Sequence, residues 1–249
     1  MKKILSIIII SIIIPFSVFA NNDNGFGTAN ELYNEGKYEQ AIQLYDSLLQ
    51  SNIESAALFY NIGNAYYKLD NIPKAILYFE KAKKIEPNNS DILYNIELAN
   101  TRIADKIETV PEFFLRTMYV NLRNSLNEAQ WTVVNISLLI VFLIFVIMFF
   151  TMQNKRQLWF SMAIVFLILT FISGIFGYKS YREKIIHNTA IIFTPTIDIK
   201  SAPDHKSSTI FILHQGTKVE LLENSAKWQK IRIASGSEGW LKLDDIEKI

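Results

Sequence analysis

Three long apolar runs dominate the pattern of hydrophobic and polar positions along the chain. The first covers residues 4–14, directly behind two lysines. The second and third cover residues 132–152 and 157–178, and they contain no charged side chain in 21 and 22 positions, respectively. A membrane-spanning helix needs about 20 mostly apolar residues. The pattern therefore predicts two transmembrane helices in the middle of the chain.

The two predicted spans, 131–152 and 158–178, form a hairpin because only residues 153–157 separate them. This loop contains Lys155 and Arg156, and basic loops favour the cytoplasmic side of a membrane. Basic residues also follow the second span, so the loop charges alone do not fix the orientation.

Residues 1–20 predict a secretory signal sequence. Lys2 and Lys3 precede the apolar run, and the small residues Val18 and Ala20 occupy the positions that signal peptidase reads, so we expect cleavage after Ala20. An uncleaved anchor is the alternative. Export of the chain from residue 21 onward places both segments that flank the hairpin in the periplasm. The protein is then expected in the bacterial inner membrane, with the loop on the cytoplasmic side.

Residues 21–110 contain an internal repeat with a period of 34 residues. Each copy reads as two helices separated by a turn. The matched pairs include Ala41 and Ala75, Ile42 and Ile76, Tyr45 and Phe79, Asn30 and Asn64, and Tyr33 and Tyr67. A third copy begins where Tyr60-Asn61-Ile62 recurs as Tyr94-Asn95-Ile96, and it is either a full unit or only a capping helix.

This repeat resembles the tetratricopeptide repeat, because Tyr66, Ala75, Phe79, Ala82 and Pro87 follow the family pattern in order. The resemblance implies an all-α solenoid whose first helices line a groove for a segment of a partner protein. Asparagine and tyrosine suit peptide binding through amide hydrogen bonds and aromatic area. The candidate peptide-binding residues are Asn30, Tyr33, Tyr60, Asn64, Tyr67, Tyr94 and Leu98. The alternative is that they are ordinary, partly exposed helix residues.

Residues 111–130 connect the repeats to the first span. Large apolar side chains recur there every three to four residues, which predicts an amphipathic helix. This helix either lies on the membrane surface or packs on the repeats as a last helix. Ser125 and Glu128 have the spacing of a capping box, which predicts the start of the helix that enters the first span.

After a linker at 179–189, residues 190–249 change to short, strand-like runs separated by polar turns. The expected strands are Ala190–Thr194, Ile197–Lys200, Thr209–Leu213, Lys218–Leu222, Trp228–Ile233 and Gly239–Lys242. Their number and spacing suit a small all-β barrel. The blocks 197–203, 216–221, 228–231 and 239–241 resemble the bacterial SH3 family in the correct order. Such domains often bind cell-wall peptides or partner proteins. We expect Trp228 and Trp240 to be core residues, with a ligand platform as the alternative.

Composition narrows the classes of function. The net charge of +1 argues against a nucleic-acid binder. The absence of cysteine excludes disulfides, thiolate metal sites and a cysteine nucleophile. His205 and His214 have no second histidine or carboxylate at metal-binding spacing, and no catalytic triad or phosphate loop is recognisable. We therefore expect a non-enzymatic protein with no cofactor and no metal.

The predicted architecture is a multidomain membrane protein: a tetratricopeptide solenoid, a two-helix transmembrane hairpin and a small SH3-like barrel. This order of modules resembles the BatE-type proteins of bacterial aerotolerance operons. The resemblance implies membrane partners with von Willebrand factor A domains and a MoxR-type ATPase. We expect an extracytoplasmic protein-interaction scaffold that is held in the lipid bilayer. The alternative is a cell-wall protein that binds or senses peptidoglycan through the SH3-like domain.

Overall fold

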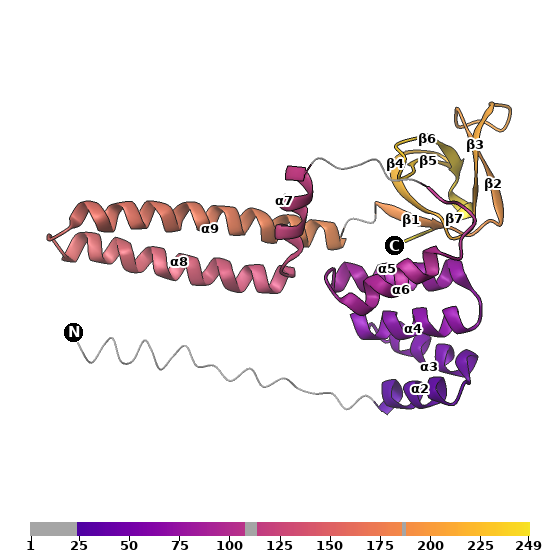
Figure 1. Ribbon diagram of the computed structural model, residues 1–249, viewed down its shortest axis with the longest axis horizontal. Helices are drawn as coiled ribbons and strands as arrows, with labels where there is room; N and C mark the ends of the chain where they lie inside the picture. The colour runs from indigo at the N-terminus through magenta and orange to yellow at the C-terminus, as the bar shows by residue number, and fades with distance from the viewer. Residues whose placement is uncertain (1–23, 108–113, 186–187) are drawn as a thin grey trace.

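The computed structural model describes residues 24–107, 114–185 and 188–249. The predicted signal sequence at 1–20 lies outside these residues. Figure 1 shows a stack of short helices, a pair of long helices that projects away from the stack, and a curled sheet that lies against it.

Five short helices form the stack. They are α2 (Asn24–Asn34), α3 (Tyr38–Gln50), α4 (Ala56–Lys68), α5 (Ile72–Ile85) and α6 (Ser90–Asn100). The side chains of Ser55, Asn71 and Asn89 accept hydrogen bonds from main-chain N–H groups in the first turns of α4, α5 and α6. Such caps satisfy donors that have no partner within the helix. The third copy of the repeat is the single helix α6, because turns follow it at 101–104.

Two clusters of buried side chains hold the stack together. Tyr45, Leu58 and Ile62 lie in the cluster between the first two helix pairs, and Phe79 lies in the second cluster with α6. Gly63 sits where α4 approaches α5, and a Cβ added there would lie 2.6 Å from the ring of Phe79. The repeat therefore needs its smallest residue at this position.

The long pair consists of α8 (Glu128–Thr151) and α9 (Arg156–Ile185). Both helices are long and apolar enough to cross a membrane, with mean hydropathies of 3.1 and 2.3. Of the most apolar stretch of each helix, 0% in α8 and 11% in α9 is buried inside the protein. The core helix of a soluble protein would be covered instead, so this exposure favours a lipid environment.

The boundaries of the pair differ from those predicted. The capping box at Ser125 and Glu128 is wrong. Asn127 caps α8, and Gln130 returns the second hydrogen bond. Asparagine is as good an N-cap as serine, so the cap forms two residues later. At the other end α9 continues through most of the predicted linker 179–189, since no proline or glycine interrupts that segment.

A polar contact joins the two long helices. The amide nitrogen of Asn135 in α8 donates to the carbonyl oxygen of Thr170 at 2.7 Å and to the hydroxyl oxygen of Ser173 at 2.8 Å, both in α9. Gly174 and Gly177 face α8 at this level, where an added Cβ would lie 3.3 Å from Asn135 and Trp131, respectively. Small residues and interhelical hydrogen bonds are typical of helices that pack within a membrane.

Helix α7 (Phe114–Asn124) crosses the open end of the hairpin, roughly perpendicular to α8 and α9 in Figure 1. Its Tyr119 ring lies 5.6 Å from Phe176 of α9, and Trp131 Nε1 donates to the carbonyl oxygen of Arg123 at 2.8 Å. None of its side chains is buried. Its large apolar residues are exposed, and its C-terminal end contacts the repeats, where the side-chain amide of Asn88 donates to the carbonyl oxygen of Asn124.

The sheet contains β1 (Thr189–Ile192), β2 (Thr196–Lys200), β3 (Thr209–His214), β4 (Lys218–Ser225), β5 (Trp228–Arg232), β6 (Glu238–Lys242) and β7 (Ile246–Lys248). The six expected strands are present, with ends shifted by up to three residues. Strand β7 was not among them. It follows a short 3-10 helix at Leu243–Asp245 and pairs with β1.

The sheet of the predicted SH3-like barrel is not closed. The strands pair in the order β3-β2-β6-β5-β4-β1-β7, which leaves β3 and β7 as the edges of an open, curled sheet. The end formed by β1 and β7 lies on the helical stack instead of meeting β3. Ile191 of β1 and Ile249 belong to the same buried cluster as Ile76 of α5. A helix therefore covers this edge.

Candidate interaction surfaces

The predicted groove residues on the first helices of the stack form a hydrogen-bonded ladder. Asn61 Nδ2 of α4 donates to Asn30 Oδ1 of α2 at 2.8 Å. One repeat later, Asn95 Nδ2 of α6 donates to Asn64 Oδ1 of α4 at 2.8 Å and to Tyr60 Oη at 3.0 Å. Asn30, Tyr60 and Asn64 thus hold successive first helices together.

Tyr45 of α3 adds a second donor to Asn30 Oδ1, at 2.6 Å. Burial raises the pKa of Tyr45 to about 12, although a hydrogen bond with Asn61 lowers it in part. The phenol therefore keeps its proton at physiological pH. The carbonyl oxygen of Asn30 is satisfied within the protein by Tyr45 and Asn61 and is poorly suited to accept a hydrogen bond from a peptide.

Aromatic groups remain accessible on the same face. Tyr94 of α6 is 64% exposed, and Leu98 lies one turn further along that helix, half-buried. Tyr33 is half-buried against the edge of the Tyr38 ring, with ring centroids 5.3 Å apart. Tyr67 of α4 lies below the guanidinium of Arg102, 5.5 Å from its ring centroid. The accessible surface of the groove is therefore aromatic rather than amide-rich.

Sequence reasoning did not assign Asn61, Asn95 or Arg102 to this face. The asparagines carry a usable signal, because they are 34 residues apart and repeat the spacing of Asn30 and Asn64. Arg102 carries none. It lies in the turn after α6 and reaches Asp70 in the turn between α4 and α5, at 2.5 Å. Only the packing of α6 on α5 brings these turns together.

Trp228 and Trp240 lie on the outer face of the sheet, which corrects the expectation of core positions. Both are half-buried, whereas their strand neighbours Gln229, Ile231 and Leu241 point into the core. In the β5–β6 ladder Trp228 pairs with Lys242 and Trp240 pairs with Lys230. The two tryptophans are therefore diagonal neighbours on one face of the sheet.

Basic groups and a histidine surround these indoles. Trp240 also pairs with Lys200 of β2, so it lies between Lys200 and Lys230 across three strands. The ring of His205 lies 5.0 Å from that of Trp228, edge to face. Lys230 is paired with Glu238 at 3.0 Å and Lys200 with Asp198 at 3.4 Å, so the charges on this face are balanced. The aromatic faces themselves suit flat, partly apolar ligands. The role of this face as a ligand platform remains a prediction.

His214 has a partner that its sequence neighbourhood does not supply. Its ring Nδ1 lies 2.7 Å from Asp105 Oδ1, and its main-chain N–H donates to Asp105 Oδ2 at 2.7 Å. Thr217 donates to the same oxygen at 2.6 Å. Across the parts of the chain that the structure describes, no group of three metal-ligating side chains is present. This contact therefore joins the stack to the sheet.

Comparison with known families agrees with this geometry. Residues 56–89 match the tetratricopeptide repeat, residues 29–70 match a second TPR repeat family model, and residues 195–247 match the bacterial SH3 domain. The chain carries tetratricopeptide repeats and a bacterial SH3 domain. A search of curated proteins found no match to the chain. The matched families are binding modules that are typically non-catalytic.

Two elements that belong to the folded domains lie outside the residues that the family models match. The SH3 match begins at residue 195, after β1 (189–192), although β1 pairs with both β4 and β7. The TPR matches end at residue 89, before α6, although α6 completes the second core cluster. Of the two unmatched elements, β1 packs on the repeats, and its partner there is the matched helix α5.

Proposed function

We propose that this protein is a membrane-anchored interaction scaffold of the bacterial envelope. The observation that carries the proposal is that two binding modules pack on each other at one end of an exposed apolar hairpin. Confinement to a membrane raises the effective concentration of weak binding modules toward partners in the same bilayer. Modest affinities are then sufficient for assembly.

The contact between the modules supports a hairpin that crosses the membrane twice. The repeats and the SH3 domain share a buried cluster and the Asp105 contact, so they must lie on the same side of the membrane. An even number of spans between them meets this condition. Together with the predicted signal sequence, this parity favours an inner-membrane protein with both modules in the periplasm and loop 152–155 in the cytoplasm.

The tetratricopeptide face is the proposed docking site for a partner membrane protein. The resemblance to BatE-type proteins suggests a partner with a von Willebrand factor A domain, in an aerotolerance complex that also involves a MoxR-type ATPase. Tyr67 and Tyr94 are the proposed anchors because tyrosine offers a large contact area at low entropic cost. Asn64 is not an anchor, since its oxygen holds α6.

The double substitution Tyr67→Ala and Tyr94→Ala tests this docking site. Tagged full-length protein is purified in mild detergent from cells that also express the von Willebrand factor A proteins of the same operon. We expect recovery of the partner to fall at least about tenfold, because buried tyrosines are frequent binding hot spots. Leu93→Ala, an exposed neighbour on α6, is the matched control. Equal recovery with both variants would reject the tyrosine face.

A second candidate function is binding of the cell wall through the outer face of the SH3 domain. The half-exposed indoles of Trp228 and Trp240 favour it, because aromatic faces stack on sugars and flat peptide groups. Full-length protein in detergent should sediment with purified peptidoglycan, and Trp228→Ala with Trp240→Ala should abolish sedimentation. Ile212→Ala on the edge strand β3 serves as the control. If the wild-type protein stays in the supernatant, this function is rejected.

A further inference from the structure

A groove of about 500 Å³ lies along the long pair, between α8 and α9. We call it the hairpin groove. Its walls are the apolar side chains of Leu139, Leu167, Phe171 and Ile175, and Tyr178 lies at one end. All five side chains are exposed, although the two helices pack on each other. In a hairpin that spans the membrane, this concave apolar surface faces the lipid.

One polar side chain, that of Asn135 in α8, lines the hairpin groove and is half-buried. The main-chain oxygen of Thr170 can only accept a hydrogen bond, so the NH2 group of Asn135 must face α9. The carbonyl oxygen of Asn135 accepts no hydrogen bond from any residue that the structure describes. It is also not enclosed, since the described side-chain atoms that are both buried and unpaired are Tyr119 Oη and Trp159 Nε1. A free acceptor therefore lies at the surface of the hairpin.

This acceptor lies within the apolar part of the hairpin. Asn135 is four residues, or about 6 Å, further along α8 than Trp131, and tryptophan concentrates at the headgroup level of a bilayer. Lipid chains offer no hydrogen-bond donor, and an amide left unpaired in hydrocarbon costs free energy. The hairpin groove therefore favours an occupant that is apolar along its length and carries a donor at one point.

A transmembrane helix of another protein has this chemistry. Its main-chain N–H groups are used within the helix, so the donor comes from a polar side chain. A second copy of the hairpin lacks such a donor at the depth of Asn135. In the described hairpin, the NH2 group of Asn135 already has two acceptors, and the nearby hydroxyl groups donate to main-chain oxygens of their own helices. These hydroxyl groups belong to Thr132, Ser137, Thr170 and Ser173.

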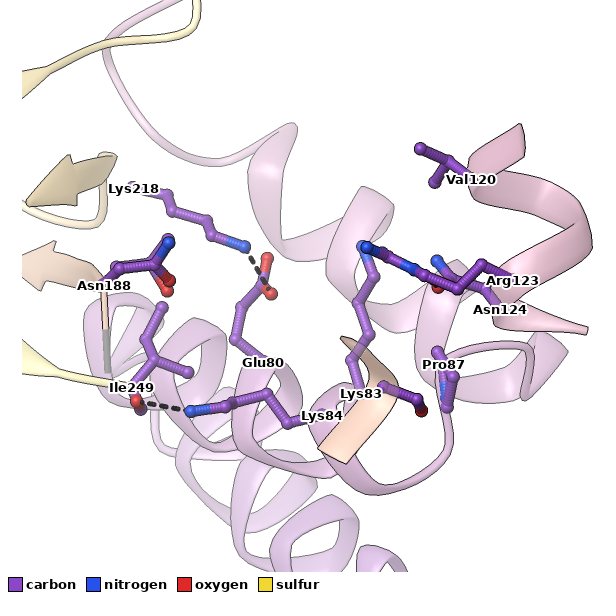
Figure 2. A pocket seen from close by; sticks show the side chains of 12 residues that line it. Glu80, Lys83, Lys84, Pro87, Val120, Arg123, Asn124, Asn188, Lys218 and Ile249 are labelled. Carbon is purple, nitrogen blue, oxygen red and sulfur yellow. Dashed lines mark hydrogen bonds and ion pairs between the residues drawn. The ribbon is translucent and has the colours of Figure 1, made fainter. Parts of the chain in front are cut away.

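The hairpin groove ends close to the two binding modules. Tyr178 and Lys179 form its end, and the next residue of α9, Ser180, lines the pocket where α5, α7 and β4 meet. Figure 2 shows that pocket, in which Glu80 of α5 pairs with Lys218 of β4 at 2.7 Å. A helix seated in the groove would therefore leave the membrane next to the repeats and the SH3 domain.

We propose that the hairpin groove docks a transmembrane helix of a different membrane protein. That helix places a side-chain donor opposite the carbonyl oxygen of Asn135, and its apolar residues cover Leu139, Phe171 and Ile175. Side-chain hydrogen bonds of this kind join helices within membranes. The inference deepens the scaffold function proposed above and rests on its membrane anchoring, because the carbonyl oxygen of Asn135 would be hydrated by water outside a bilayer.

The test uses two synthetic transmembrane peptides of leucine and alanine as probes. One carries a single asparagine at the depth of Asn135, and the other carries leucine there. The chain has no cysteine, so full-length protein takes one fluorophore at Asn154→Cys, in the exposed loop. Energy transfer to labelled peptide in liposomes measures association. The asparagine peptide should bind about threefold to thirtyfold more tightly than the leucine peptide. Equal binding of both peptides would overturn the proposal.

Two variants and one control locate the effect. Asn135→Leu should make the two peptides bind alike. Leu139→Trp fills the hairpin groove without removing the bonds of Asn135 to α9, so its effect does not depend on loosening the hairpin. It should weaken binding of the asparagine peptide, whereas Ile140→Trp, an equally exposed neighbour outside the groove, should not. Equal weakening by both tryptophan variants would overturn the groove as the site.

Two further measurements separate the other outcomes. Energy transfer between two labelled copies of the protein that Asn135→Leu abolishes would assign the hairpin groove to a second copy and overturn the different partner. Release of the wild-type protein from membranes by alkaline carbonate would overturn the anchoring itself. Failure of the peptide preference in a protein that resists carbonate would reject the docking site alone and leave the scaffold function standing.

Discussion

The carboxylate of Asp105 accepts three hydrogen bonds that join the repeat stack to the SH3 domain. Its donors are His214, through the main chain and the ring, and Thr217. Burial alone would raise the pKa of Asp105, but the hydrogen bonds from Thr217 and His214 outweigh burial and hold the pKa below its ordinary value of 3.8. The ionised form is therefore favoured in the folded protein.

Replacing Asp105 by Asn should loosen this contact. The new NH2 group faces donors that have lost a charged acceptor, and an unsatisfied donor of this kind costs about 1–3 kcal/mol. Hydrogen exchange measured by mass spectrometry should therefore rise in peptides that cover 209–217 and 102–107, while those from α2 and α3 stay unchanged. Asp198→Asn, an exposed carboxylate beside Lys200, is the matched control. Unchanged exchange at 209–217 would contradict the assignment.

The same contact predicts a direction for pH dependence. A lowered folded pKa stabilises the protein above the unfolded pKa, and this contribution is lost as the pH falls through the folded pKa. The difference in melting temperature between wild type and Asp105→Asn should stay constant from about pH 7 to pH 4 and should shrink below that. A difference that already shrinks between pH 7 and pH 5 would assign the effect to another group.

Some contacts of single residues can be predicted from the sequence, and others cannot. The resemblance to the tetratricopeptide repeat implies a small residue where paired helices cross, Gly63 occupies that position, and the ring of Phe79 fills the space beside it. The partnership of Asp105 and His214 spans 109 positions, so no local pattern contains it. The groove asparagines are an intermediate case. Their periodicity is visible in the sequence, but the same periodicity suits peptide binding and helix-to-helix bonding.

At the scale of elements, periodicity predicts helices and strands well wherever one face is apolar. The 34-residue period and the alternation in β4 and β5 reflect buried faces. Strand β7, Ile246–Lys248, has two charged residues in three and gives no alternation. It forms because β1 offers it a pairing edge and α5 covers that edge. The sheet stays open because its β1–β7 end packs on α5. The alternation of apolar and polar residues within a strand does not predict such a contact between domains.

The amphipathic side of α7 gives a prediction at this scale. The chain contains no cysteine, so single-cysteine variants carry one spin label each. In liposomes a nitroxide at Met118→Cys, on the exposed apolar side, should collide more with oxygen than with a water-soluble nickel complex. Val120→Cys, two residues later, lines a pocket between α7 and α5 and should show the reverse. Equal exposure of both labels to nickel would contradict the location of α7 at the membrane surface.

At the scale of the whole molecule, the repeats and the SH3 domain pack into one body, and the two long apolar helices project from it. Its two domains meet through a shared apolar cluster, the Asp105 contact and the Lys218–Glu80 ion pair, which is 2.7 Å long. A flexible tether would let each domain sample partners independently. When the domains are packed together, the distance and orientation between two surfaces are fixed. One surface carries Tyr67 and Tyr94 of the repeats, and the other carries Trp228 and Trp240 of the sheet. This arrangement suits two partners that must be held at a defined distance.

Because the two domains are packed together, we predict that both lie on one side of the membrane and that the loop between the long helices lies on the other. Cysteines placed at Ser51 in the repeats, Asn154 in the loop and Ser235 in the SH3 domain report the three regions, and all three positions are exposed. In intact spheroplasts an impermeant maleimide should label Ser51→Cys and Ser235→Cys, and Asn154→Cys only after lysis. Labelling of Asn154→Cys alone would move both domains to the cytoplasm and reject wall binding. Labelling of only one of the two domain sites cannot coexist with the shared core of Ile76, Ile191 and Ile249, so it would reject the packed body itself.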